Sequence, residues 1–211
     1  MKMKTAYFVR HGESEGNAAG VHQSASTPLS EIGQSQAKIV ALRFKHIRVE
    51  QILASPMTRA RQTAQAIANY IQMSVTENDL FRERRGPSAL VGLSQQSEKS
   101  KSIRSELAQR LLEEDGNWRH SDEETAREFA NRAQKALDFL RQQPADNLVV
   151  VSHALNIRMI LANVLNQTGE LKHLYEIYSN FELNNTSLSV ITYDYEKARW
   201  QVLCINDHSH L

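Results

Sequence analysis

The chain has 211 residues, 41% of them hydrophobic and 23% charged, with a formal net charge of +1. This composition is typical of a globular protein with one large core, and it excludes the strongly basic character of many nucleic-acid-binding proteins. The single cysteine, Cys204, excludes an internal disulfide, and no apolar run approaches the ~20 residues of a membrane span. We therefore expect a cytoplasmic protein without nucleic-acid or membrane partners.

The first part of the chain alternates between strand and helix patterns. Thr5–Val9 is rich in aromatic and β-branched residues, which is typical of a strand. After Ser55-Pro56, the apolar residues Ala60, Ala64 and Ile67 recur at the spacing of a helix with one buried face. These patterns predict strands at 5–9, 50–54 and 75–76, and helices at about 30–44 and 57–71.

The second part of the chain begins irregularly and then returns to alternation. Ser121 and Glu124 have the spacing of a capping box, which predicts that a long helix begins at 121 and runs to about 142. The continuous apolar run Leu148–Val151 predicts a strand that is buried on both faces. The other patterns predict helices at about 98–112 and 155–165, and a hairpin of strands at 187–193 and 200–205.

This alternation predicts an α/β fold, a three-layer αβα sandwich with a mainly parallel central sheet. The chain contains neither an internal repeat nor a linker, so we expect residues 1–211 to form a single domain. Residues 82–117, which Gly86-Pro87 interrupts, are expected to form a helical, cap-like excursion from this domain.

Three of the expected strands end in residues that suit an anion. Arg10-His11 follows the first strand, Arg59 lies just beyond the second, and Ser152-His153 ends the buried one. If these strands are neighbours, their carboxyl ends lie side by side and these side chains share a pocket. Arginine forks match phosphate oxygens, and a neutral imidazole keeps a lone pair that can attack phosphorus. We therefore infer a pocket for a phosphate dianion, with His11 as the nucleophile.

For several other polar residues, the sequence is compatible with more than one role. A leaving alkoxide needs a proton, and Glu83 is one candidate general acid, although the residues alone do not favour it over other acids. Asn17 either donates to the phosphate or merely turns the chain. Arg84 and Arg85 either bind a second anionic group of the substrate or form an exposed basic loop. Because no carboxylate cluster accompanies the histidines, we expect no metal ion and no cofactor.

Several motifs resemble those of one known family. The run Val9–Asn17 resembles the signature of the histidine phosphatase superfamily, which has the phosphoglycerate mutase-like fold. The run Ser55–Ala64 resembles the second motif of this family, with its phosphate-binding arginine at Arg59. The run Val150–His153 resembles the motif that carries the second catalytic histidine, and Glu83 falls at the position of the acid. The resemblance extends over nearly the whole chain.

The resemblance implies a role for each of these residues. His11 is expected to form a phosphohistidine. Glu83 is expected to protonate the leaving group and then to activate the water that cleaves the phosphohistidine. The phosphoryl oxygens are expected to be bound by Arg10, Asn17, Arg59 and His153. The implied activity is hydrolysis of a small phosphorylated metabolite.

The chain departs from the family pattern at two places. Ala154 and Leu155 follow the second histidine, where the family usually has two glycines. The backbone N–H of Ala154 can still bind phosphate, so we expect the chemistry to survive with a changed pocket shape. Arg84-Arg85-Gly86-Pro87-Ser88 follows Glu83, where the family often has a glycine, an aromatic residue and a Glu-Gly pair. We therefore expect the substrate to be selected by residues 82–117 and by the loop at 18–29.

Two alternatives remain open at this point. A phosphoglycerate mutase generally has a longer insertion than the stretch from Glu83 to His153, and it usually has a tryptophan near the first motif, so the phosphatase is favoured. A non-catalytic phosphoprotein-binding module is expected to have lost catalytic residues, and all of the core set is present here. The sequence identifies neither the phosphomonoester nor the oligomeric state, and a homodimer is compatible with it.

Overall fold

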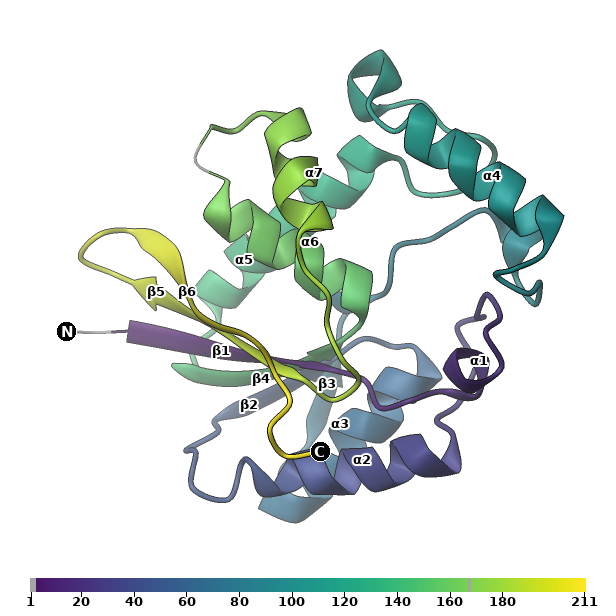
Figure 1. Ribbon diagram of the computed structural model, residues 1–211. Coiled ribbons are helices and arrows are strands. Elements are labelled where there is room, and N and C mark those ends of the chain that lie inside the picture. Colours follow the sequence, from purple (N-terminus) through teal and green to yellow (C-terminus); the bar gives the residue numbers. More distant parts are fainter. Residues whose placement is uncertain (1–2, 167) are drawn as a thin grey trace.

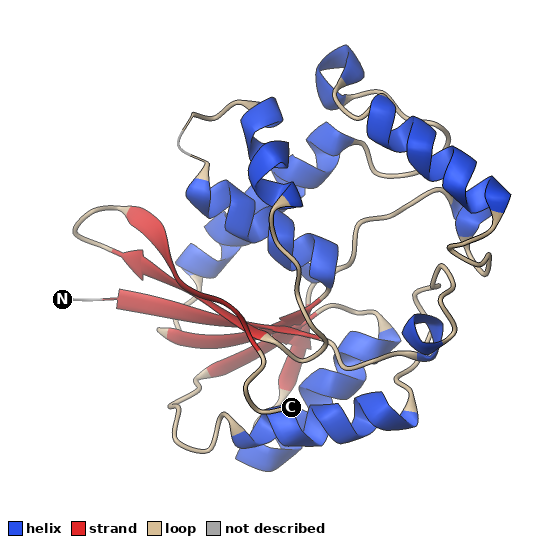
Figure 2. Ribbon diagram, viewed as in Figure 1, coloured by secondary structure: helices blue, strands red, loops and turns tan. Residues whose placement is uncertain are grey.

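The computed structural model describes residues 3–166 and 168–211, which form one six-stranded sheet with helices on both faces (Figures 1 and 2). The strands are β1 (Met3–Arg10), β2 (Gln51–Ala54), β3 (Val75–Glu77), β4 (Asn147–Ser152), β5 (Leu188–Asp194) and β6 (Arg199–Asp207). The helices are α1 (Glu15–Ala18), α2 (Glu31–Leu42), α3 (Thr58–Ile71), α4 (Glu98–Gln109), α5 (Ala126–Gln142), α6 (Ala154–Leu165) and α7 (Leu171–Ser179). The expected three-layer αβα sandwich is confirmed.

The sheet order brings the three motif-bearing strands together. The strands run β3-β2-β4-β1-β5-β6, in which β4 pairs with both β1 and β2, and all three are parallel. Val151 on β4 lies opposite Val9 on β1 and Ala54 on β2, so the three carboxyl ends are level. Within the described sheet, only the β1–β5 and β5–β6 pairs are antiparallel. The sheet is therefore mainly parallel, as expected, and its central strand is β4.

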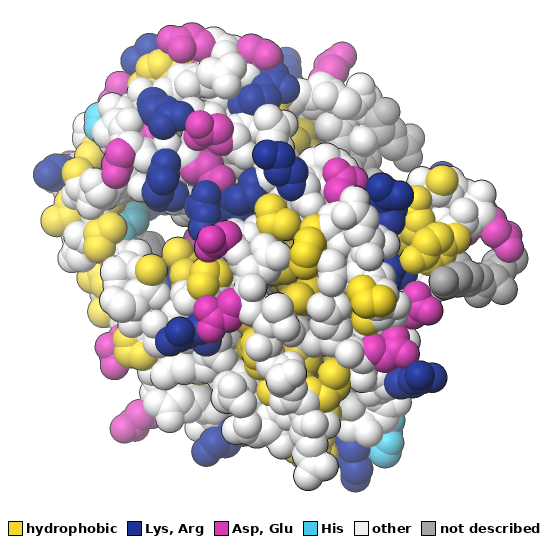
Figure 3. Space-filling model, turned by 180° about the vertical axis from the view of Figure 1, so that it is seen from behind, with side chains coloured by type: hydrophobic (Ala, Val, Ile, Leu, Met, Phe, Trp, Pro, Cys, Tyr) yellow, Lys and Arg dark blue, Asp and Glu magenta, His cyan; other side chains and the backbone are white. Residues whose placement is uncertain are grey.

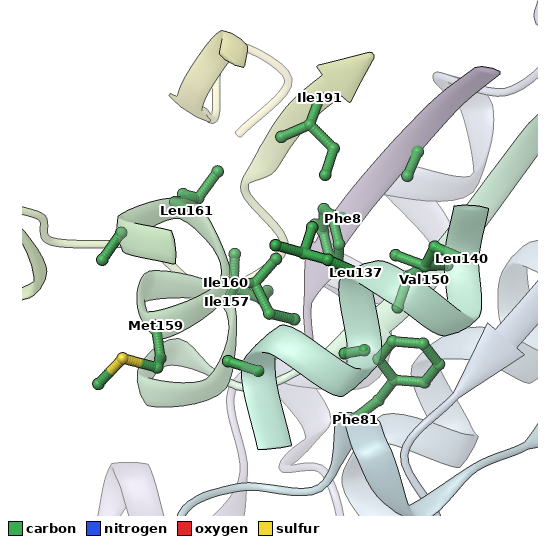
Figure 4. Packing of buried hydrophobic residues seen from close by; sticks show 14 of the residues in the cluster. Phe8, Phe81, Leu137, Leu140, Val150, Ile157, Met159, Ile160, Leu161 and Ile191 are labelled. Carbon is green, nitrogen blue, oxygen red and sulfur yellow. The ribbon is translucent and has the colours of Figure 1, made fainter. Parts of the chain in front are cut away.

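Two apolar cores hold the layers together. On one face, α5 and α6 pack against side chains such as Phe8 and Val150, and Figure 4 shows Leu137 and Ile157 reaching them from these helices. On the other face, α2 and α3 pack against Val9 and its neighbours on β2 and β4. Burial of each such side chain contributes about 1.5–3 kcal/mol. The continuous apolar run of β4 is explained by this burial on both faces.

The beginning of α5 differs from the expected one. The helix begins at Ala126, because Thr125 rather than Ser121 is the N-cap. The Thr125 side chain accepts from the Glu128 N–H at 3.1 Å, and the Glu128 carboxylate accepts from the Thr125 N–H at 3.0 Å. The Glu124 carboxylate is instead bound by Arg132 at 2.7 Å. Two capping-box patterns follow each other in the sequence, at 121–124 and 125–128, and the first is lost because Glu124 has this buried partner.

Two further helix predictions need correction. Helix α4 ends at Gln109, three residues before the expected end, and a short 3-10 turn follows it at Glu113–Gly116. Helix α7 was not predicted, although Leu171, Leu174 and Tyr175 have helical spacing and its inner residues are buried. Figure 1 places α4 on the same side of the molecule as α1, away from the helices that cover the sheet. No helix in the described part of the chain combines the length and apolar character needed to cross a bilayer.

Candidate active site

The carboxyl ends of β1, β2 and β4 bring the predicted histidines and arginines together. Arg10 is the last residue of β1 and His11 follows it, while His153 follows the end of β4. The rings of His11 and His153 have centroids 5.0 Å apart, and their exposed fractions are 3% and 0%. Arg59 lies in the first turn of α3 and is also buried. The structure therefore brings Arg10, His11, Arg59 and His153 to the same end of the sheet.

The hydrogen bonds of His11 determine which ring nitrogen carries the proton. Nδ1 lies 2.6 Å from the Gly12 carbonyl oxygen, which can only accept, so Nδ1 is protonated and Nε2 keeps its lone pair. The Arg59 Nε–H donates to this Nε2 at 3.3 Å. Burial, together with the charges of Arg59 and Arg10, holds the pKa of His11 well below its usual value. His11 is therefore neutral at pH 7, with Nε2 available as a nucleophile.

The second histidine presents a nitrogen that has no protein partner. His153 Nε2 lies 2.8 Å from the Ser55 hydroxyl oxygen, while the buried Nδ1 has no hydrogen-bond partner among the described residues. The Nε of Arg10 is likewise buried and has no hydrogen-bond partner among the residues that the structure describes. Burial, followed by His11 and the nearby arginines, lowers the pKa of His153 far below its usual value. Buried unpartnered groups are costly, so these two atoms mark a place for a polar ligand.

A loop before β5 closes over the end of β1. The Asn185 side-chain amide donates to the His11 carbonyl oxygen at 2.9 Å, and the Thr186 N–H donates to the Arg10 carbonyl oxygen at 3.0 Å. Arg10 also donates from Nη1 to the Leu183 carbonyl oxygen. Thr186 takes a left-handed φ of 55°. The partners in these contacts lie more than 170 positions apart along the chain, so local sequence patterns do not predict them.

The Glu83 carboxylate lies against the N-terminus of α6. It accepts from the backbone N–H groups of Arg84 at 2.9 Å, Leu155 at 3.2 Å and Asn156 at 3.0 Å. The first N–H groups of an α-helix have no partner within the helix, and the His153 side chain at the N-cap of α6 does not bind them. The Glu83 carboxylate binds two of them instead, and its negative charge suits the helix N-terminus. Burial lowers the pKa of the Arg10 guanidinium, and the charge of Glu83 opposes this shift. Glu83 thus faces the cationic site, next to Ala154, the first residue of α6.

Asn17 helps to cap the N-terminus of α1. Its side-chain oxygen accepts from the Ser14 N–H at 3.2 Å and from the Ser14 hydroxyl at 2.8 Å, which completes a capping box at α1. The oxygen end of the amide is therefore occupied, and the NH₂ end is the one that suits an anion. The structure thus explains Asn17 as a cap, and its contact with phosphate stays a prediction.

A buried acid that the sequence analysis placed in a helix cap anchors the segment around Glu83. The Glu124 carboxylate accepts from Arg132 at 2.7 and 2.8 Å and from Arg82 at 3.2 Å. Burial raises the pKa of Glu124, but the hydrogen bonds and charges of Arg132 and Arg82 outweigh it and lower the pKa overall. Arg84 donates to the Glu124 carbonyl oxygen at 3.2 Å, while Arg85 is exposed. On the rear face, several Lys and Arg side chains lie close together in the upper part of the view, with Asp and Glu side chains among and around them (Figure 3).

Two glycines allow the loop that follows β1 and carries His11 to pack against α2. A Cβ at Gly12 would lie 2.5 Å from the Gly33 carbonyl oxygen, and a Cβ at Gly33 would lie 1.8 Å from the Glu13 carbonyl oxygen. Both distances are far shorter than contacts that real side chains make, and both obstacles are backbone atoms. The backbone that positions His11 is therefore held by a contact that only glycine permits.

We expect Gly33→Ala to destabilise the protein by about 1–3 kcal/mol and to lower activity, because the loop after His11 must shift to admit the methyl group. Chemical denaturation and turnover measurements check this. Gly86→Ala is the matched control, since a Cβ at Gly86 meets no atom within 4 Å. Equal stabilities for the two variants would contradict the packing argument.

The two buried histidines predict a pH dependence of stability. Their pKa values are low in the folded state and about 6.5 in the unfolded chain, so the unfolded state binds more protons below that pH. The contribution of the two histidines to the free energy of unfolding is then fully present above about pH 6.5. Below that pH the free energy of unfolding falls by up to about 1.4 kcal/mol per pH unit for each histidine. Denaturation between pH 7.5 and 5.0 measures this slope. His153→Gln is expected to reduce it, and replacement of the exposed His46 is expected to leave it unchanged.

Comparison with known proteins agrees with this geometry. Residues 6–208 match the model of the histidine phosphatase superfamily, branch 1. The chain belongs to this superfamily. A relative named "Probable phosphoglycerate mutase GpmB", from Photorhabdus laumondii, is 29% identical over 221 residues, which cover 99% of this chain and 95% of the relative.

Solved structures of other superfamily members are similar over nearly the full length. A phosphoserine phosphatase mutant from Entamoeba histolytica, in complex with phosphoserine, has a TM-score of 0.77 and 25% identity over 98% of each chain. Bacillus stearothermophilus YhfR has a TM-score of 0.79 at 20% identity, again over 98% of each chain, and supports the fold. The phosphoglycerate mutase-like architecture expected from the motifs is thus confirmed. Within the described residues, no group of three or more His, Cys, Asp or Glu side chains is arranged to hold a metal ion.

Proposed function

We propose that this superfamily member is a phosphomonoester hydrolase that acts through a phosphohistidine on a small phosphorylated metabolite. The observation that carries the proposal is the state of His11, whose neutral ring has its Nε2 lone pair directed to the Arg59 guanidinium. A lone pair beside fixed cations is what attack on a phosphate dianion requires, because the cations neutralise the charge of the phosphoryl oxygens. The unpartnered Nδ1 of His153 and Nε of Arg10 supply further donors for those oxygens.

In the first step, His11 Nε2 attacks phosphorus, the P–N bond forms and the P–O bond to the leaving group breaks. Glu83 in its protonated form gives its proton to the leaving alkoxide. In the second step, the Glu83 carboxylate takes a proton from water, whose oxygen attacks phosphorus as the P–N bond breaks. Inorganic phosphate leaves and Glu83 is protonated again, ready for the next turnover. The backbone donors that hold Glu83 at the start of α6 support its placement beside the phosphoryl group.

The group beyond the phosphate is expected to be anionic. Burial raises the pKa of Tyr178 to about 12, and the charges of Arg158, Glu83 and Arg84 also act on this phenol. Tyr178, on α7, packs edge-on against the Phe129 ring at 6.2 Å, and the Arg84 backbone N–H donates to the Glu83 carboxylate at 2.9 Å. Arg84 is half-buried over the Phe129 ring, at 5.6 Å from its centroid. A cation and a phenol at this position favour a substrate that carries a carboxylate or a second phosphate.

A phosphoglycerate mutase is the second candidate, favoured by the name of the Photorhabdus relative. A mutase must retain its bisphosphorylated intermediate and exclude water. The short stretch between Glu83 and His153 and the absence of a tryptophan near the first motif favour the hydrolase. The similarity to a phosphoserine phosphatase supports the same choice.

A substrate screen tests the proposal. Sugar phosphates, nucleotides, phosphoglycerates and phosphoamino acids are incubated with the protein, and both free phosphate and transferred phosphate are measured. The proposal predicts release of phosphate to water, with higher kcat/KM for substrates that carry a second anionic group. Isomerisation of a phosphoglycerate without net phosphate release would favour the mutase.

A further inference from the structure

The loop after α1 is tied to the loop that precedes α4. Val21 and Ser94 form an antiparallel β-bridge. The His22 N–H donates to the Leu93 carbonyl oxygen at 2.9 Å, and the Gly92 N–H donates to the His22 carbonyl oxygen at 2.8 Å. Figure 1 shows these loops approaching each other between α1 and α4. Residues 20–25, called here the 20–25 segment, thus connect the cap-like excursion to the first motif.

A side-chain hydrogen bond strengthens this connection. His22 Nε2 lies 2.7 Å from the hydroxyl oxygen of Ser100, a fully buried residue on α4. Burial and the charge of Arg104 lower the pKa of His22, so the ring is neutral at pH 7. A buried serine hydroxyl on a helix would otherwise bond to a carbonyl of its own helix. Here the partner of Ser100 Oγ is an imidazole 78 positions away in the chain.

The other end of the 20–25 segment contacts the phosphate site. The Ser24 carbonyl oxygen accepts from Arg59 Nη1 at 3.0 Å, and the Ala25 carbonyl oxygen accepts from the Thr58 N–H at 3.0 Å. Arg59 Nε donates in turn to His11 Nε2 at 3.3 Å. The orientation of the Arg59 guanidinium is therefore set on one side by His11 and on the other by a carbonyl two residues from His22.

We propose that His22 is a positioning residue: through its bond to Ser100 it holds the Ser24 carbonyl, and with it the Arg59 guanidinium, in the orientation that binds phosphate. The inference rests on the proposed function, since it takes Arg59 as a ligand of the phosphoryl group. Small displacements of a charged donor weaken binding strongly, because bidentate arginine contacts need defined geometry. Loss of the His22–Ser100 bond should therefore weaken phosphate binding even though neither residue belongs to the catalytic set.

A purely structural role makes a different prediction. If His22 only stabilises the cap-like excursion, its replacement lowers the melting temperature and leaves phosphate affinity unchanged. Ser97→Ala supplies the comparison, because the Ser97 hydroxyl caps α4 by accepting from the Ser100 N–H at 3.3 Å and donates to the Ser94 carbonyl oxygen at 2.8 Å. None of its hydrogen bonds within the described residues is made to His22. This variant weakens the same helix without breaking the bond to the 20–25 segment.

The experiment measures the dissociation constant of inorganic phosphate by calorimetry, and as competitive inhibition of aryl phosphate hydrolysis. His22→Ala and Ser100→Ala are each expected to raise it roughly 5- to 20-fold, and the double variant no further, because both remove one coupled interaction. His22→Gln, which keeps a side-chain hydrogen-bonding group, is expected to recover most of the affinity. Ser97→Ala is expected to lower the melting temperature and to keep the constant within twofold of the wild type.

Two outcomes overturn the proposal. One is that His22→Ala and Ser100→Ala change phosphate affinity no more than Ser97→Ala does, and the other is that their effects add fully. Arg59→Ala separates this failure from that of the proposed function. If Arg59→Ala weakens phosphate binding while His22→Ala does not, only the positioning role fails. If the wild type does not bind phosphate, or Arg59→Ala binds it equally well, the proposed function fails and the positioning role fails with it.

Discussion

Replacement of His11 with alanine is expected to lower kcat for phosphomonoester hydrolysis by about 10⁴-fold or more. The variant removes the Nε2 lone pair that the mechanism needs, and the neighbouring imidazole of His153 is assigned to donate from its unpartnered Nδ1 to the phosphoryl oxygens instead. Arg10, Arg59 and His153 remain, so substrate is expected still to bind. Steady-state kinetics with a generic aryl phosphate, together with calorimetric binding of inorganic phosphate, checks both parts of this prediction.

The exposed His46 provides a matched control for this variant. His46→Ala is expected to keep kcat within about twofold of the wild type, because surface substitutions rarely affect the fold or a distant site. Far-UV circular dichroism and melting curves show whether His11→Ala is folded. A folded His11→Ala variant that keeps more than a tenth of the wild-type kcat would rule out His11 as the nucleophile.

Replacement of Glu83 with glutamine is expected to lower kcat by about 10²- to 10⁴-fold for substrates with alkyl leaving groups. Glutamine keeps the size of the side chain, and its amide oxygen can still accept from the N–H groups of Arg84 and Asn156, which share one oxygen of Glu83. Its NH₂ group cannot accept from the Leu155 N–H, and it cannot give a proton to an alkoxide. A nitrophenolate leaves without that proton, so phosphorylation of His11 is expected to be much less affected with nitrophenyl phosphate. Pre-steady-state bursts of nitrophenol would isolate this first step.

The leaving-group comparison is what makes the Glu83 prediction specific. Glu176→Gln, on the exposed face of α7, is the control for a loss of one negative charge. If Glu83→Gln slows the first step equally for alkyl and nitrophenyl substrates, Glu83 acts through charge or packing rather than as the acid.

The parts of the site predicted from sequence are those whose signals are local. Arg10-His11, Arg59 and Ser152-His153 each follow an apolar strand, and parallel strands with level carboxyl ends bring such residues together without further information. The central position of β4 followed from its unbroken apolar run. The same kind of local signal failed at α5, where two capping-box patterns are adjacent in the sequence and only the pairing of the buried Glu124 with Arg132 decides between them.

The contacts that sequence reasoning missed all connect distant parts of the chain. Asn185 donates to the His11 carbonyl across 174 positions, and His22 reaches Ser100 across 78. Each of these residues looks like an ordinary loop or surface residue until the fold brings its partner close. The protonation state of His11 was expected from the cationic surroundings alone. The Gly12 carbonyl oxygen adds the physical reason that the proton is on Nδ1 and the lone pair is on Nε2.

Trapping of the covalent intermediate tests the central claim most directly. The wild-type protein is mixed with a nitrophenyl phosphate labelled in the phosphoryl group, and the reaction is quenched in base within milliseconds, because phosphohistidine is stable in base. The Glu83→Gln variant is treated in the same way, since it is expected to slow dephosphorylation. Peptide mass spectrometry then locates the label. The account predicts one phosphoryl group per chain on Nε2 of His11 and none in His11→Ala. Label on another residue, or hydrolysis at the wild-type rate by a folded His11→Ala variant, would contradict it.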